Sequence, residues 1–252
     1  LNKIIVLLKS EEKQKFLLND VKARFNNKIS YAPKIFSHGD DWLIEEFIEG
    51  IPYNRIKNNL NDPVEIALKH NIELVEKNKI KVSKEKYIND NYKEFHNLIE
   101  MVINVNLKKL ILELNELLIK KIKNSLIDKI EISITHGDFQ EGNMRINSNN
   151  EVYILDWESS DIRYYMYDFF VLFSGIRTGN SLEKSFELFS NKLENIKMLK
   201  DKYSFNLTKI LLCYEELRFN LNEKISINFY DSGKGLSRLV TDINNYISKL
   251  DE

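Results

Sequence analysis

The sequence is poor in the residues that support disulfide-linked and turn-rich folds. Among its 252 residues are one cysteine, Cys213, eight glycines and three prolines. A single cysteine excludes an internal disulfide, and no group of Cys and His residues has the spacing of zinc ligands. So few glycines and prolines argue against a β-sandwich with many tight turns and favour long helices. Cys213 lies in an apolar stretch, which favours a small buried core residue.

An excess of charge of one sign is also lacking, as are long apolar runs. The 37 Lys and Arg residues against 38 Asp and Glu give a formal net charge of −1, so no broad positive field is present to bind nucleic acid. No apolar run approaches the length of a membrane span, and the start lacks the pattern of a signal peptide. We therefore expect a cytoplasmic protein without nucleic-acid or membrane partners. The first residue is Leu rather than Met, which is compatible with a start further upstream.

Residues 1–52 predict a small lobe that mixes strands with a helix. Residues 3–9 are mostly β-branched and apolar and predict a strand, and Ser10 is a suitable N-cap for a following helix. Segments 34–37 and 42–48 predict two further strands joined by a turn. A chain of this length can bury a sizeable core.

Residues 53–252 predict a mainly helical lobe. Apolar residues recur at helical spacing after Pro63, which suits a first helical position. Nothing repeats and no low-complexity linker appears, so we expect an α+β chain of two lobes. The predicted helices are 64–79, 84–103, 106–127 and 167–176, with more toward the end of the chain.

Two short apolar runs in the second lobe carry polar residues that suit phosphoryl transfer. Asp138 follows the first run and a His-Gly pair, Asn143 comes five residues later, and Asp156 ends the second run. Strand ends and tight turns can bring such oxygen-bearing side chains together, and Mg²⁺ prefers hard oxygen ligands. Asn143 and Asp156 would then hold the metal, while Asp138 orients and deprotonates an attacking hydroxyl.

A plain hairpin is the alternative, because Asp, Gly and Asn are all common in turns. Against it, the whole set arrives in order, with the second aspartate placed directly after a strand. The strand-turn-strand context therefore favours a phosphotransfer site.

A resemblance to a known family rests on these motifs and on two segments nearer the start: His136-Gly-Asp138, Asn143, Asp156-Trp-Glu158, Pro33–Gly39 and Trp42–Gly50. They are similar to the catalytic, metal-binding and hinge motifs of the aminoglycoside phosphotransferase and choline kinase family. The resemblance covers roughly residues 3–55 and 132–175. It implies the bilobal protein-kinase-like fold and the activity of an ATP-dependent kinase acting on small molecules.

The resemblance implies a role for each residue of the predicted site. Asp138 is the catalytic base, and His136 supports the catalytic loop. Asn143 and Asp156 are the Mg²⁺ ligands. Asp168 matches a family aspartate that braces the catalytic loop, although an aspartate favoured by the dipole at a helix N-terminus is an equal alternative.

Nucleotide binding is assigned by the same resemblance. Lys9 would hold the α- and β-phosphates of ATP, and the Glu46 carbonyl and the Ile48 amide would hydrogen-bond adenine; GTP is an alternative donor. Only eight residues precede Lys9, fewer than the two strands and phosphate-covering loop usual in the family, so we expect either a truncated sequence or a smaller lobe. The carboxylates that could pair with Lys9 are Glu11, Glu12 and Asp20.

The predicted function is transfer of the γ-phosphate of ATP to a hydroxyl of choline, ethanolamine, a sugar, an aminoglycoside or homoserine. The alternative is a non-catalytic nucleotide-binding or scaffold protein with a kinase-like fold. Charge does not decide the acceptor. A cation-attracting rim could be formed by Glu158, Asp161, Glu215 and Glu216, and a solvated helix face explains Glu215 and Glu216 equally well. Two arginines could equally serve an anionic acceptor, Arg163 and Arg177.

Overall fold

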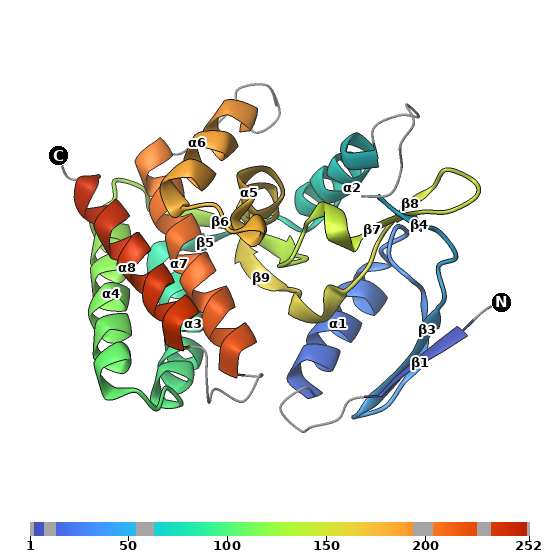
Figure 1. Cartoon of the computed structure of the whole chain (residues 1–252), viewed down its shortest axis with the longest axis horizontal. Coiled ribbons are helices and arrows are strands. Elements are labelled where there is room, and N and C mark those ends of the chain that lie inside the picture. Colours follow the sequence, from blue (N-terminus) through green and yellow to red (C-terminus); the bar gives the residue numbers. More distant parts are fainter. Residues whose placement is uncertain (1–2, 8–13, 54–62, 194–203, 226–232, 251–252) are drawn as a thin grey trace. The chain divides into compact units, whose positions relative to one another are not determined.

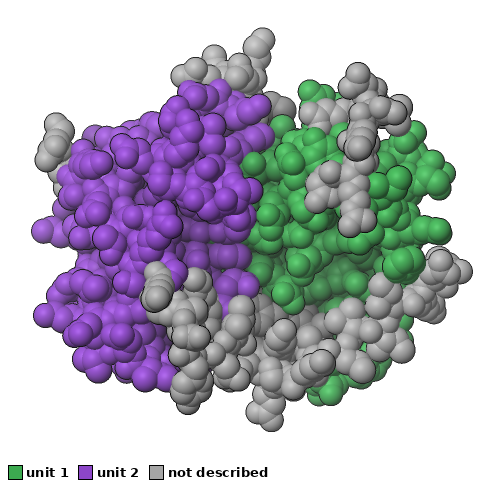
Figure 2. All heavy atoms as spheres, viewed as in Figure 1, with its two compact units in different colours: residues 1–79, 133–172 green, residues 80–132, 173–252 purple. Residues whose placement is uncertain are grey.

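A computed structural model of the chain describes residues 3–7, 14–53, 63–193, 204–225 and 233–250. The chain divides into two compact units, shown in Figure 2. Unit 1 contains residues 1–79 and 133–172, and unit 2 contains residues 80–132 and 173–252. The chain thus leaves unit 1 and later returns to it, so the units do not coincide with the lobes expected on either side of residue 52, a boundary that stays a prediction.

Unit 1 begins with an antiparallel sheet that carries one helix. Strand β1 (Lys3–Leu7) pairs with β3 (Trp42–Glu46), which also pairs with β2 (Ile35–His38), giving the order β1-β3-β2. Helix α1 (Gln14–Asn27) packs against β2, and its Val21 forms a small core with Ile35 and Leu43. The predicted series of strand, helix, strand, turn and strand is therefore confirmed (Figure 1).

A second small sheet of unit 1 has the order β4-β7-β8, formed by β4 (Ile51–Pro52), β7 (Met144–Ile146) and β8 (Val152–Ile154). Helix α2 (Pro63–Asn78) packs on β7 and β8. Its first residue is Pro63, as predicted, because proline lacks the N–H that the first helical turn cannot use.

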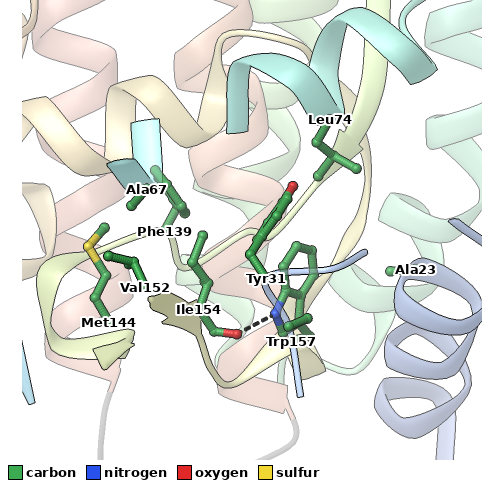
Figure 3. Packing of buried hydrophobic residues seen from close by; sticks show 10 residues of the cluster. Ala23, Tyr31, Ala67, Leu74, Phe139, Met144, Val152, Ile154 and Trp157 are labelled. Atoms are coloured by element: carbon green, nitrogen blue, oxygen red, sulfur yellow. Dashed lines mark hydrogen bonds between the residues drawn. The ribbon is translucent and has the colours of Figure 1, made fainter. Parts of the chain in front are cut away.

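The main core of unit 1 lies between these elements, as Figure 3 shows. Trp157, in the short 3₁₀ helix η4 (Trp157–Ser159), is 2 % exposed and donates its indole N–H to the Ile154 carbonyl over 2.8 Å. The Tyr31 ring lies 6.2 Å from that of Trp157. Since a buried indole is stable only when its N–H is bonded, this contact fixes the turn that follows β8. The buried residues of this core are Ala23, Tyr31, Ala32, Ala67, Leu74, Phe139, Met144, Val152, Ile154 and Trp157.

Three further elements lead to and from the predicted site. Strand β6 (Lys129–Thr135) ends directly before the His-Gly-Asp sequence. Strand β9 (Asp161–Tyr164) follows η4, and the Asp161 carbonyl accepts a hydrogen bond from the Thr135 hydroxyl over 3.0 Å. Helix α5 (Tyr167–Ser174) comes next and carries Asp168 in its first turn.

Unit 2 is mainly helical. Helices α3 (Lys84–Glu100) and α4 (Val105–Asn124) are capped by Ser83 and Asn104, whose side chains accept backbone N–H groups of the first turn. Both pack against α7 (Phe205–Ile225), which also contacts α8 (Gly233–Lys249), while α6 (Leu182–Leu193) packs on α8 (Figure 1). Strand β5 (Ile80–Ser83) pairs with the first four residues of β6.

The α+β class and the predicted helices are confirmed. Cys213 is completely buried, as expected. Strands β5 and β9 were not predicted, because short segments often acquire strand structure from their pairing partner, although the equally short β2 was recognised from its own sequence. In the part of the chain that the structure describes, no helix has both the length and the apolar character needed to cross a membrane.

Candidate active site

The loop after β6 is held by a buried carboxylate. Asp168 accepts the backbone N–H of His136 over 2.7 Å and that of Gly137 over 2.9 Å, one on each oxygen. Burial raises the pKa of Asp168 to about 6, although the two backbone hydrogen bonds and Arg163 oppose that rise. Gly137 has a φ of +88°, and a Cβ there would lie 2.2 Å from the Ser159 carbonyl oxygen, so the turn requires glycine.

His136 links this loop to the turn that carries Asp156. Its Nε2–H donates to the Leu155 carbonyl over 2.8 Å, and its Nδ1 accepts the backbone N–H of Asp138 over 3.3 Å. The ring is buried and lies 4.7 Å from that of Trp157. Burial lowers the pKa of His136 to about 4, so the imidazole is neutral near pH 7, as one donor and one acceptor nitrogen require.

Asp138 and Asn143 are directly bonded. The Asn143 side-chain amide nitrogen donates to the Asp138 backbone carbonyl over 2.8 Å and to its carboxylate Oδ2 over 3.0 Å. Both partners are acceptors, so the orientation of the amide is defined by its contacts. The nitrogen is thus committed to Asp138, and the Asn143 oxygen is the end of the group that could bind a metal. Asp138 is only half-buried, so a ligand could reach it.

Asp156 is brought to the same neighbourhood by the backbone. The Leu155 N–H donates to the Asn143 carbonyl over 2.8 Å, which places the residue before Asp156 beside the other predicted ligand. Asp156 is exposed and adopts the left-handed conformation, with φ 64° and ψ 60°. Such a conformation is uncommon outside glycine and costs free energy, so surrounding contacts must hold it.

These donors fit magnesium. One amide oxygen and one exposed carboxylate are the hard ligands that Mg²⁺ takes when phosphate oxygens and water complete its shell. The structure thus brings Asp138 into contact with both His136 and Asn143. It bonds Leu155, the residue before Asp156, to Asn143. The chemical roles of these residues stay predictions.

Helix α1 adds a cluster of charges that the sequence analysis did not predict. The buried Arg24 guanidinium contacts both carboxylate oxygens of Asp20, one of them over 2.6 Å, and donates to Glu45 over 2.7 Å and to the Pro33 carbonyl over 2.9 Å. Burial raises the pKa of Asp20, and the nearby charges of Glu45 and Asp156 add to that rise. The spacing Asp20-x-x-x-Arg24, one helical turn, was the available signal.

Of the predicted nucleotide-binding residues, Lys9 lies outside the described residues, as do Glu11 and Glu12. Glu46 ends β3; its N–H donates to the Lys34 carbonyl over 2.9 Å and its carboxylate accepts the Lys34 N–H over 3.2 Å. Ile48 is buried, two residues beyond the strand. The roles of Glu46 and Ile48 toward adenine stay predictions.

The two readings offered for Glu215 and Glu216, a cation-attracting rim and a solvated helix face, are both wrong. Glu215 is completely buried and accepts the Tyr87 hydroxyl over 2.6 Å and Arg218 over 3.1 Å. Glu216 is 2 % exposed and accepts Arg177 over 2.6 Å. Buried charges must be paired in this way, so neither glutamate faces a solvated acceptor.

Arg163 and Arg177 are likewise engaged. Arg163 is 3 % exposed and donates to the Thr135 hydroxyl over 2.9 Å. Arg177 lies over the Phe219 ring at 4.0 Å in addition to its contact with Glu216. The prediction that these arginines suit an anionic acceptor therefore has no support from Arg163, which is buried.

Comparisons with known proteins agree with the resemblance noted in the sequence. Residues 97–186 match the model of a family described as "Phosphotransferase enzyme family". The choline kinase of Streptococcus pneumoniae is similar in structure, with a TM-score of 0.57 and 16 % identity over 97 % of this chain and 86 % of that one. No curated protein sequence gives a significant match.

Two further solved structures are similar. An ethanolamine kinase of Plasmodium vivax has a TM-score of 0.52 and 18 % identity over 98 % of this chain and 75 % of that one. An aminoglycoside phosphotransferase solved with gentamicin has a TM-score of 0.51 and 16 % identity over 96 % and 84 %. The resemblance noted in the sequence is thus confirmed: the chain has the protein-kinase-like fold of these solved structures, and residues 97–186 match the phosphotransferase family model.

Proposed function

We propose that the chain is a magnesium-dependent phosphotransferase that moves the γ-phosphate of ATP to a hydroxyl group of a small molecule. The observation that carries this proposal is the direct contact between Asp138 and Asn143, with the turn before Asp156 bonded to Asn143. A base and two metal ligands in one loop cluster are the groups that phosphoryl transfer needs.

Each residue has a separate task in this proposal. Asp138 orients the acceptor hydroxyl and accepts its proton as the oxygen attacks the γ-phosphorus. The Asn143 oxygen and the Asp156 carboxylate hold Mg²⁺, which neutralises charge on the β- and γ-phosphates when bound. His136 and Asp168 act by fixing the loop: neutral His136 bonds the Leu155 carbonyl, and Asp168 bonds two backbone N–H groups.

The donor is proposed from relatives that bind adenine nucleotides. The choline kinase of Streptococcus pneumoniae has been solved with AMP, and an aminoglycoside phosphotransferase with ADP. In this chain the Glu46 carbonyl and the Ile48 amide are proposed to hydrogen-bond adenine, and Lys9 to hold the α- and β-phosphates. GTP is the alternative donor.

The acceptor class is proposed as an amino alcohol, an aminoglycoside, a sugar or homoserine. Similar structures include kinases named for choline and ethanolamine and one solved with gentamicin. The exposed Glu158, two residues after Asp156, suits a cationic acceptor of this kind, whereas Glu215 and Glu216 are buried inside unit 2.

The test is a coupled assay of ADP release across choline, ethanolamine, sugars, aminoglycosides and homoserine, with ATP and GTP compared as donors. We expect acceptor-dependent ADP release with at least one compound, and its loss in the Asp138→Asn variant. Nucleotide binding without release for any acceptor would favour the scaffold reading instead.

A further inference from the structure

Gln140 is placed to control the orientation of the proposed base. It precedes the 3₁₀ helix η3 (Glu141–Asn143) and has an extended backbone, with φ −133° and ψ 161°. Its side-chain amide nitrogen donates to Asp138 Oδ2 over 2.7 Å, and its backbone carbonyl accepts the Asn143 N–H over 3.0 Å. One residue thus contacts both ends of the catalytic loop.

The two oxygens of Asp138 are distinguished by these contacts. Oδ2 receives two amide donors, Gln140 at 2.7 Å and Asn143 at 3.0 Å. A carboxylate oxygen has two lone-pair directions, so Oδ2 is fully used. A hydrogen bond to a charged acceptor is stronger than a hydrogen bond between neutral groups. Two such bonds to Oδ2 therefore restrain rotation of the Asp138 carboxylate.

Asn143 divides its side chain among three partners, whereas Gln140 directs its amide nitrogen at one. The Asn143 amide nitrogen is shared between the Asp138 carbonyl and Oδ2, while its oxygen is assigned to Mg²⁺. Within the part of the chain that the structure describes, the Gln140 side-chain amide nitrogen is bonded to Asp138 alone. The hydrogen bond from Gln140 is also the shorter of the two.

We propose that Gln140 is a positioning residue that holds Asp138 so that Oδ1 serves as the base. This proposal rests on the proposed function and deepens it. In the step concerned, the proton of the acceptor hydroxyl passes to Asp138 Oδ1 and the hydroxyl oxygen bonds to the γ-phosphorus. The bond from that phosphorus to the β–γ bridging oxygen breaks, and ADP leaves.

A three-variant kinetic series tests the role. Gln140→Met keeps the size of the side chain but removes the donor, and we expect kcat to fall about tenfold, the worth of one hydrogen bond to a charged group, with KM for the nucleotide unchanged. Gln140→Glu also places a like charge beside Asp138, so its loss should exceed that of Gln140→Met. Asn149→Ala, an exposed amide in the β7–β8 turn, is the matched control and should retain wild-type kcat.

Two results of the kinetic series would overturn the proposal. A kcat for Gln140→Met within twofold of the wild type would remove Gln140 from the role. A tenfold rise in the KM for the nucleotide, with kcat unchanged, would assign Gln140 to nucleotide binding instead.

A spectroscopic measurement separates this proposal from the proposed function. The chain has only two glutamines, Gln14 and Gln140, so ¹⁵N-glutamine labelling gives two side-chain amide groups, and Gln140→Met assigns them. Asp138→Ala should move the Gln140 amide signal and leave that of Gln14 in place. An unmoved Gln140 signal would refute the hydrogen bond and the proposal. A wild type that releases no ADP would refute the proposed function, and the amide signal would still decide whether Gln140 holds Asp138.

Discussion

Two clusters in this chain each contain a buried, hydrogen-bonded carboxylate, but the groups that surround the two carboxylates differ. In unit 1, Asp168 is buried and bonded to two backbone N–H groups, and the loop that it holds presents the half-buried Asp138. In unit 2, Glu215 is buried, and its oxygens are bonded to Tyr87 and Arg218 within the helical core. The first cluster holds a loop whose Asp138 carboxylate a ligand can reach. In the second, the charge of Glu215 is compensated by its own neighbours inside the core.

The two clusters differ in the groups that compensate the buried charge. A buried charge is tolerated only when hydrogen bonds or an opposite charge compensate it. In unit 1 the compensation comes from backbone N–H groups of a loop, so it shapes that loop. In unit 2 it comes from side chains on packed helices, so it contributes to packing. Substitutions at the loop in unit 1 should therefore lower turnover, and substitutions in the cluster of unit 2 should lower the free energy of unfolding.

The largest effect is expected for Asp138→Asn, which should lower kcat by about 10² to 10⁴ because a positioned base is lost. The fold should persist, since the side chain is half-buried and the substitution conserves its shape. Kinetics of ADP release and a thermal melt check both statements. Asp90→Asn, an exposed partner of Lys86, is the control and should behave as the wild type. Turnover near the wild-type rate would take the base role from Asp138.

Glu215→Ala should act in the opposite way, lowering the free energy of unfolding by about 3 kcal/mol, because the buried Arg218 keeps only the longer contact with Glu94, at 3.6 Å, and the Tyr87 hydroxyl loses its acceptor. Urea unfolding measures this. Glu113→Ala, an exposed residue 3.8 Å from Lys109, should change stability by less than about 0.5 kcal/mol. If Glu215→Ala were as stable as its control, the cluster would not contribute to the core as described.

A smaller effect is expected from pH at Asp168. Its pKa is raised from an ordinary value near 4 to about 6 on folding, so the folded state binds the proton more tightly. Its contribution to stability is therefore fully present below pH 4 and is lost as pH rises through 6, by on the order of 3 kcal/mol. The free energy of unfolding of the wild type, taken relative to that of Asp168→Asn and measured by urea unfolding, should fall from pH 4 to pH 7. A constant difference would contradict the assigned shift.

That Asp138 contacts His136 and Asn143 could be predicted from the sequence, because these residues are close together in the chain. His136, Asp138 and Asn143 lie within eight residues, and their spacing on a tight turn restricts where their side chains can go. The turn also requires glycine at position 137, where φ is positive. Such constraints are visible in the chain itself.

The contacts that the sequence did not predict depend on tertiary packing. Gln140 carries no turn signature, and only the folded loop shows that its amide reaches Asp138. Glu215 and Glu216 sit in α7, which is buried along much of its length, so their burial follows from the helices around it. An apolar flank on both sides of the Glu pair was the signal that such a helix gives.

The central claim is that Asn143 and Asp156 hold a divalent ion and its nucleotide beside Asp138. Calorimetric titration of the nucleotide with and without Mg²⁺ tests it most directly, in the wild type, in Asp156→Ala and in the control Asp90→Ala. We expect Mg²⁺-dependent binding of ATP in the wild type and in the control, and its loss in Asp156→Ala. An unchanged Mg-ATP titration for Asp156→Ala would contradict the claim.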